Sequence, residues 1–129
     1  MPNDETLKRI LLVEDEEDIR AVAEIALESV GGFQLKVCAS GPEALESIAG
    51  FAPQLIILDV MMPGMEGPET LREIRKLPEY ALTPAVFMTA KVQADEIQSY
   101  LAGGATGVIP KPFDPMTLSD RILEIWQSR

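Results

Sequence analysis

Residues 55–67 read LIILDVMMPGMEG, and this stretch decides the fold. Four apolar residues, 55–58, lead directly into the carboxylate of Asp59, and Pro63 and Gly64 follow as a turn signal. A short apolar run that stops at turn residues is typical of a strand buried on both faces. Because burial penalises an unpaired charge, an acid at the end of such a strand indicates a site rather than simple packing.

Apolar runs alternate with helical patterns on both sides of this stretch. Each predicted strand is followed by apolar residues at intervals of three or four, which is the pattern of an amphipathic helix. Capping signals agree, since Ser40 with Glu43 forms a capping box and Asp114 before Pro115 predicts the start of the last helix. The predicted strands are 9–13, 33–38, 55–58, 85–88 and 107–109, and the helical patterns are 19–30, 44–48, 71–74, 94–101 and 118–125.

Five strand–helix pairs in succession predict an α/β fold. Strands that alternate with helices form a parallel sheet, with helices covering both of its faces. The chain has 129 residues, which fits a single domain. We expect residues 1–8 to be a short polar lead-in and residues 9–129 to be the domain.

Composition excludes several classes of function. Lys and Arg total 11 against 21 Asp and Glu, and the formal charge of −10 opposes direct binding to a nucleic-acid backbone. With no His and only Cys38, the usual zinc ligand sets, Ser-His or Cys-His catalytic pairs and an intrachain disulfide are excluded. No apolar run approaches the roughly 20 residues that span a membrane. The sequence therefore predicts a cytoplasmic protein that binds neither membrane nor nucleic acid directly.

Reactive side chains follow four of the five predicted strands. Glu14 and Asp15 follow the first strand, Asp59 ends the third, Thr89 ends the fourth and Lys111 follows the fifth. Ligands of open parallel sheets bind outside the carboxyl ends of the strands. If the strand order is 2-1-3-4-5, the first and third strands are neighbours, and the three carboxylates converge on one pocket.

Three converging carboxylates raise the pKa of one of them unless a cation intervenes. Such a set of oxygen ligands suits Mg²⁺, which also binds phosphoryl oxygens. Asp59 is then a nucleophile able to form an aspartyl-phosphate, with Lys111 and the Thr89 hydroxyl contacting the phosphoryl oxygens. The backbone carbonyl of Met61, which the turn exposes, is a further candidate metal ligand.

Each of these residues also has a simpler explanation. Acids at 14–18 are favoured at the start of any helix, and Asp59 suits a turn before Pro-Gly. Thr89 and Lys111, taken alone, are an ordinary strand-end residue and a surface lysine. Their joint placement along one edge of the sheet is what favours a phosphoryl site.

The segments LLVEDEEDIR, LIILDVMMPGMEG, VFMTA and IPKPF together resemble the receiver domain of bacterial response regulators, over essentially the whole chain. The resemblance implies a flavodoxin-like fold with the strand order 2-1-3-4-5. It also implies a signalling switch rather than an enzyme. A histidine kinase or a histidine phosphotransfer protein would donate the phosphoryl group, and a downstream protein or a fused output domain would respond.

The resemblance implies a role for each of the three acids and for Met61. Asp59 is the phosphoacceptor, Asp15 coordinates Mg²⁺ directly, Glu14 coordinates it through water, and Met61 contributes its backbone carbonyl. These roles follow from the family and not from spacing alone.

The resemblance also covers the opposite side of the site, with one departure. Thr89 is the switch hydroxyl, Lys111 contacts the phosphoryl group, and the peptide between Lys111 and Pro112 is cis. The family often has Tyr or Phe three residues before this lysine, where the chain has Val108. We therefore expect the structural response to phosphorylation to be weaker or differently routed.

Two other functions stay open. A pseudo-receiver would bind a partner without phosphorylation, and Val108 is the residue that favours it. A phosphatase with an aspartyl nucleophile, of the haloacid-dehalogenase type, would carry a second Asp two residues after Asp59. Met61 occupies that position and argues against it.

Overall fold

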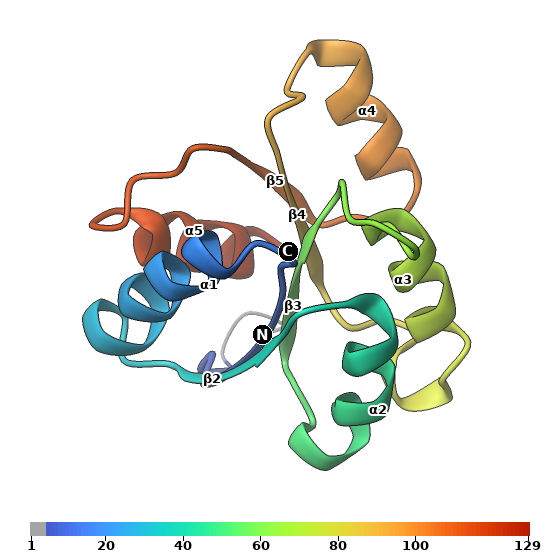
Figure 1. Ribbon diagram of the computed structural model, residues 1–129, viewed down its shortest axis with the longest axis horizontal. Coiled ribbons are helices and arrows are strands. Elements are labelled where there is room, and N and C mark those ends of the chain that lie inside the picture. The colour runs from blue at the N-terminus through green and yellow to red at the C-terminus, as the bar shows by residue number, and fades with distance from the viewer. Residues whose placement is uncertain (1–4) are drawn as a thin grey trace.

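The computed structural model describes residues 5–129 and shows a five-stranded sheet with helices on both faces (Figure 1). The strand order is β2-β1-β3-β4-β5, and every neighbouring pair is parallel. The predicted fold class and strand order are confirmed. The strands are β1 (Arg9–Val13), β2 (Gln34–Cys38), β3 (Leu55–Asp59), β4 (Ala85–Thr89) and β5 (Gly107–Pro110).

The helices divide between the two faces. One face is covered by α1, its π-helical continuation η1, and α5, whereas α2, α3 and α4 lie on the other side (Figure 1). A short 3-10 helix, η2, follows α3. The bounds are α1 (Glu17–Glu24), η1 (Ile25–Val30), α2 (Gly41–Phe51), α3 (Gly67–Arg75), η2 (Pro78–Tyr80), α4 (Ala94–Ala102) and α5 (Leu118–Ser128).

The central strand β3 is buried along its whole length, as its apolar run predicts. Leu55 and Ile57 face the hydrophobic cluster beneath α1 and α5. Ile56 and Leu58 face the second cluster, beneath α2 and α3. Successive side chains of a strand point to opposite faces, so a strand between two helical layers needs apolar residues at every position.

Two helices differ from the sequence pattern. Val30 belongs to the apolar pattern of the first helix but is exposed, because that helix widens into a π-helix at Ile25 and its register shifts. The last helix begins at Leu118 rather than at Pro115. The Asp114 carboxylate accepts a hydrogen bond from the N–H of Met116 at 2.9 Å, so it closes a local turn before the helix.

The first four residues of the predicted lead-in lie outside the described residues, and residues 5–8 pack against the domain. Leu7 is buried in the cluster beneath α5. The side chain of Gln54 accepts hydrogen bonds from the N–H groups of Lys8 and Arg9 at 2.7 and 2.9 Å. The indole N–H of Trp126 donates to the carbonyl of Glu5 at 2.9 Å, so Trp126 is a packing residue.

Within residues 5–129 no helix combines the length and the apolar character that crossing a bilayer requires.

Candidate functional site

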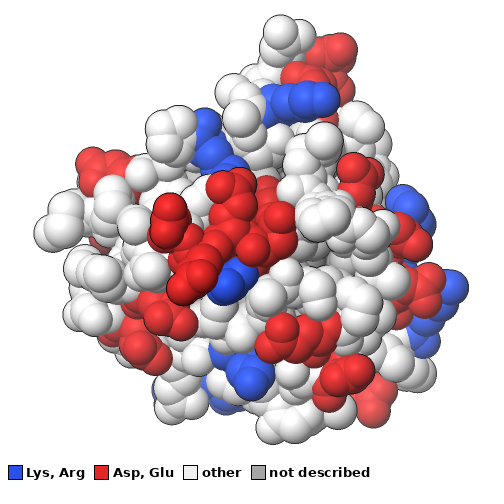
Figure 2. All heavy atoms as spheres, in the orientation of Figure 1, with Lys and Arg blue, Asp and Glu red and all other residues white. Residues whose placement is uncertain are grey.

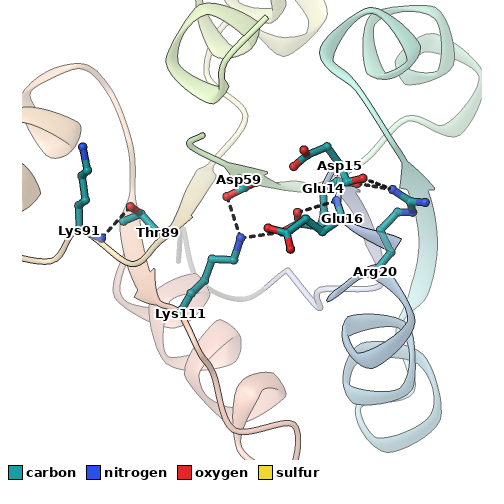
Figure 3. Close-up of polar contacts among 8 residues, drawn as sticks. All are labelled: Glu14, Asp15, Glu16, Arg20, Asp59, Thr89, Lys91 and Lys111. Atoms are coloured by element: carbon teal, nitrogen blue, oxygen red, sulfur yellow. Dashed lines mark hydrogen bonds and ion pairs between the residues drawn. The ribbon is translucent and has the colours of Figure 1, made fainter. Parts of the chain in front are cut away.

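The carboxyl ends of the strands bring the predicted acids together (Figure 3). In the pairing of β1 with β3, Val13 lies opposite Leu58, so the next residue of each chain segment, Glu14 and Asp59, emerges beside the other. Glu14, Asp15 and Asp59 each offer a carboxylate oxygen, and these oxygens lie within 4.8 Å of one another. The convergence predicted from the strand order is therefore observed. We call these three residues the acidic pocket.

Lys111 reaches the acidic pocket from the end of β5. Its ammonium group lies 3.0 Å from a carboxylate oxygen of Glu14 and 3.0 Å from one of Asp59. Both acids are buried, and a buried carboxylate without a partner would destabilise the fold. The second oxygen of Glu14 accepts a hydrogen bond from the N–H of Glu16 at 3.0 Å. Both oxygens of Glu14 are thus already bound by the protein.

Asp15 is held differently from the other two acids. Its Oδ1 atom is buried and has no hydrogen-bond partner among residues 5–129. Such an atom calls for a partner that is a cation or water. Three carboxylates facing one ammonium group also leave an excess of negative charge. The donor set therefore fits a hard divalent cation such as Mg²⁺, with Asp15 and Asp59 better placed than Glu14 for direct contact.

Burial controls the electrostatics of the pocket. It raises the pKa of Asp59 from its ordinary 3.8 to about 7. The hydrogen bond from Lys111 opposes this rise, whereas the charge of Glu14 and a side-chain hydrogen bond with Asp15 add to it. Burial alone would lower the pKa of Lys111, but its hydrogen bonds to Asp59 and Glu14 raise it. The sequence predicts a raised pKa for one of the three acids, and Asp59 has it. The main cause is burial, and repulsion between the carboxylates is a smaller one.

A cavity of about 260 Å³ lies beside Asp59 and is lined in part by Met61, Thr89 and Lys111. Thr89 is buried, and its hydroxyl accepts a hydrogen bond from the N–H of Lys91 at 3.0 Å. The ammonium group of Lys91 points away from Asp59 (Figure 3). The structure thus brings Thr89 and Lys111 to the same space as Asp59. A role for the Met61 carbonyl as metal ligand stays a prediction.

Arg20 takes part in the site, although its sequence pattern gave it no role. Its guanidinium donates hydrogen bonds to the backbone carbonyls of Glu14 and Asp15, both at 2.9 Å. One sequence signal could have revealed it, because Arg20 is the only cation between residues 14 and 30 and lies two residues after a run of five consecutive acids. Acidic side chains gather near the start of α1 on this face of the molecule (Figure 2).

The fifth strand differs from the family pattern as the sequence predicts, while the peptide between Lys111 and Pro112 is cis as expected. Val108 is half-buried and lies opposite Phe87 in the sheet. The aromatic contact of Phe87 comes instead from Tyr100 on α4, with ring centroids 5.4 Å apart.

Comparison with known proteins gives consistent matches. The model of the response regulator receiver domain matches residues 10–123. Response regulator Rre1 of Synechocystis is 36% identical over 107 residues, covering 82% of this chain and 46% of that protein. The phosphate regulon transcriptional regulatory protein PhoB of Rhizobium meliloti is 35% identical over 116 residues, covering 90% and 51%. The chain spans about half the length of these two relatives.

Solved structures agree with the sequence matches. Chemotaxis response regulator CheY4 of Vibrio cholerae superposes with a TM-score of 0.85 at 32% identity, covering 93% of this chain and 99% of that one. A response regulator from Chloroflexus aurantiacus gives a TM-score of 0.84 at 28% identity, covering 96% and 100%. The sheet order, the acids at its carboxyl edge and these matches together show that the chain belongs to the response regulator receiver domain family of two-component signalling.

Proposed function

We propose that this chain is a signalling switch that accepts a phosphoryl group on Asp59 in a Mg²⁺-dependent reaction. The observation that supports this most strongly is the placement of Lys111, whose ammonium group lies 3.0 Å from a carboxylate oxygen of Asp59 and 3.0 Å from one of Glu14. Beside it, Asp15 has a buried oxygen without a hydrogen-bond partner among residues 5–129. An ordinary structural ion pair would need one acid and not three. The arrangement suits a site that receives a dianionic phosphoryl group together with a divalent cation.

The chemistry starts at the carboxylate of Asp59. One of its oxygens is bonded to Lys111, and the other is available to attack the phosphorus atom of the donor. A P–O bond forms, the P–N bond of a phosphohistidine breaks, and the departing imidazole keeps the electron pair and takes up a proton. The ammonium group of Lys111 and the hydroxyl of Thr89 lie beside the same cavity and would then donate to the phosphoryl oxygens.

The acidic pocket serves the same reaction. When bound by Asp15 and Asp59, and by Glu14 through water, Mg²⁺ supplies positive charge to the phosphoryl oxygens. Lys111 opposes the effect of burial on Asp59 and so favours its ionised, nucleophilic form. The backbone carbonyl of Met61 completes the proposed set of metal ligands.

In this proposal, residues 9–129 act as one receiver domain in the cytoplasm, and the phosphoryl donor is a histidine kinase or a histidine phosphotransfer protein. Phosphorylation changes the affinity for a downstream protein or for a fused output domain. The proteins with similar sequences include one named as a transcriptional regulatory protein. The charge of −10 opposes direct contact between this domain and nucleic acid. The domain assists only its own phosphorylation and dephosphorylation and does not turn over a separate metabolite.

Intact mass tests the proposal after incubation with acetyl phosphate and Mg²⁺. We expect wild-type protein to gain a labile phosphoryl adduct, and we expect Asp59→Asn, or wild type in EDTA, to gain none. Absence of an adduct on wild type, with acetyl phosphate and with a panel of histidine kinases, would overturn the proposal.

A pseudo-receiver is the second candidate, because Val108 replaces the ring that usually responds to phosphorylation. Capture of partners by wild-type protein, with and without the phosphoryl group, separates the two functions. Equal capture in both states would favour the pseudo-receiver.

A further inference from the structure

Arg20 donates hydrogen bonds to three successive carbonyl groups of the loop between β1 and α1, and Figure 3 shows the two that its guanidinium makes. Its backbone N–H donates to the carbonyl of Glu16 at 2.9 Å. Its guanidinium donates, through one nitrogen, to the carbonyls of Glu14 and Asp15, both at 2.9 Å. One residue of the first helical turn therefore fixes the whole path of the chain from the strand to the helix.

The helix itself cannot hold the first two of these carbonyls. The hydrogen-bond ladder of α1 begins at the carbonyl of Glu16, which is the N-cap residue. The carbonyls of Glu14 and Asp15 precede the ladder and need another donor. Within residues 5–129, the hydrogen bonds of the Arg20 guanidinium go to these carbonyls and not to the surrounding carboxylates. This choice is informative, because a cation beside five consecutive acids would be expected to pair with one of them.

The contacts of Arg20 with the loop carbonyls matter most for the orientation of Asp15. The carboxylate of Glu14 is fixed by Lys111 and by the N–H of Glu16, and that of Asp59 is fixed by Lys111. The Oδ1 atom of Asp15 has no such partner in the described part of the chain. Apart from a side-chain hydrogen bond with Asp59, the direction of the Asp15 side chain depends on its backbone. The carbonyls that Arg20 binds belong to the two peptide planes that flank Asp15.

We propose that Arg20 is a positioning residue that aims the carboxylate of Asp15 into the acidic pocket, so that the pocket is preorganised for a divalent cation. This inference rests on the proposed Mg²⁺-dependent function. Groups that orient metal ligands without touching the metal typically change affinity by about 10- to 100-fold when removed. A guanidinium suits this task, because one of its terminal nitrogens holds two N–H groups in a fixed plane and can donate to two acceptors at once, whereas the ammonium group of a lysine rotates freely on a flexible stem.

Isothermal titration calorimetry with Mg²⁺ at fixed ionic strength tests the proposal on the intact chain. We expect Arg20→Met, which keeps the long apolar stem and removes the donors, to weaken Mg²⁺ binding by roughly 10-fold. Arg121→Ala is the control for loss of one positive charge. Arg121 is exposed on α5, and its Nε atom lies 3.8 Å from a carboxylate oxygen of Glu124. We expect the control to bind Mg²⁺ as wild type does, within about 2-fold.

A kinetic measurement separates positioning from a general loss of structure. With acetyl phosphate, we expect Arg20→Met to need about 10-fold more Mg²⁺ for half-maximal phosphorylation and to reach the wild-type rate at saturation. Arg20→Lys keeps the charge and the stem, and we expect it to fall between wild type and Arg20→Met. If Arg20→Met does not fold, Arg20→Lys decides, and reduced Mg²⁺ affinity supports the inference.

The outcomes distinguish this inference from the proposed function. Mg²⁺ affinity of Arg20→Met equal to that of Arg121→Ala would overturn the role of Arg20 and leave the proposed function intact. Wild-type affinity in Arg20→Lys, with Arg20→Met unfolded, would overturn it as well. No Mg²⁺ binding by wild-type protein would overturn the proposed function itself.

Discussion

At the scale of single residues, the site depends on the buried carboxylate of Asp59, whose negative charge has one cationic partner, Lys111, in the described part of the chain. Only 3% of the surface of Asp59 is exposed. Lys111 supplies one hydrogen bond, and the neighbouring acids Glu14 and Asp15 oppose ionisation. In the proposed reaction the charged form of Asp59 is the nucleophile, and with a pKa of about 7 its protonation state would respond to a bound cation.

The stability of the metal-free protein should depend on pH through Asp59. Its pKa is about 7 in the folded state against an ordinary 3.8, so the folded state binds the proton more tightly than the unfolded state does. The stabilising contribution is fully present below about pH 4 and is lost as the pH rises through about 7. We expect the free energy of unfolding in EDTA to fall over this range by on the order of 2–4 kcal/mol.

Asp59→Asn is the variant that isolates this effect, because its side-chain amide oxygen can still accept from Lys111. We expect it to be more stable than metal-free wild type by about 1–3 kcal/mol at pH 8, with little difference at pH 4. Urea unfolding in EDTA measures both values. Equal stability of the two proteins at pH 8 would contradict a destabilising charge at this position.

Lys111 should be essential to the metal-free fold. Lys111→Met leaves two buried acids without their shared cation, and breaking a buried pair in this way typically costs about 3–5 kcal/mol. We expect the loss to be smaller at pH 5, where Asp59 is protonated. The control Lys76→Met removes an exposed lysine paired with Glu73, and we expect a change below about 1 kcal/mol. Similar unfolding curves for the two variants would refute this role.

At the scale of elements, the backbone at the start of α3 packs closely against the backbone at the end of β3. Gly67 opens α3, and its N–H donates to the carbonyl of Val60 at 3.0 Å. A Cβ at this position would collide with backbone atoms of Asp59 and Val60, and these atoms cannot move without displacing the Asp59 side chain from the site. Glycine is therefore required here by the close approach of two backbones.

Gly67→Ala should destabilise the protein by about 2 kcal/mol or more and should slow phosphorylation of Asp59. Gly50→Ala is the matched control, because Gly50 lies in helix α2 with open space around its Cα. We expect the control to be neutral or more stable by up to about 1 kcal/mol, since alanine favours helices. Thermal unfolding compares the two, and an equal effect would contradict the close approach.

Helices and strands with a clear pattern of apolar residues could be predicted from the sequence. Helix ends and turns that depend on local hydrogen bonds could not. The apolar run of β3 identified a central strand, and the position of Asp59 at its end then placed the site. The start of α5 was misplaced, because the Asp114 carboxylate bonds to Met116 in a turn that has the same residues as a helix cap. The π-helical turns of η1 leave no sequence signal in the apolar pattern.

At the scale of the whole molecule, the acidic pocket should couple metal binding to the stability of the fold. Glu14 and Asp15 follow β1, Asp59 is the last residue of β3 and Lys111 follows β5, so the pocket exists only when the sheet is assembled. A cation that binds this pocket therefore binds the folded state and not the unfolded chain. Binding and folding are linked for this reason.

Mg²⁺ should raise the stability of wild-type protein by about 2.7 kcal/mol at a concentration 100 times its dissociation constant. Asp15→Asn and Asp59→Asn each remove a candidate ligand, and we expect both to respond much less. Asp120→Asn is the control, since Asp120 lies on α5 and is exposed. Differential scanning calorimetry with MgCl₂ and with matched NaCl measures the response, and an equal gain from both salts would contradict specific binding.

The sequence predicted which residues meet at the site, because the carboxyl ends of parallel strands share one edge of a sheet. It did not predict how they are held there. The role of Arg20 depends on the path of the loop backbone, and the rise in the pKa of Asp59 depends mainly on burial, which only the packed fold supplies. The buried indole of Trp126 likewise depends on residues 5–8 returning to α5.

We propose that Asp59 is the residue that receives the phosphoryl group. Borohydride reduces an acyl phosphate to an alcohol, so treatment of the protein after incubation with acetyl phosphate and Mg²⁺ marks the modified acid for peptide mass spectrometry. We predict conversion of Asp59 to homoserine, with Glu14 and Asp15 unchanged and with no conversion in EDTA. Conversion at a different acid, or none in protein that binds Mg²⁺, would contradict the account.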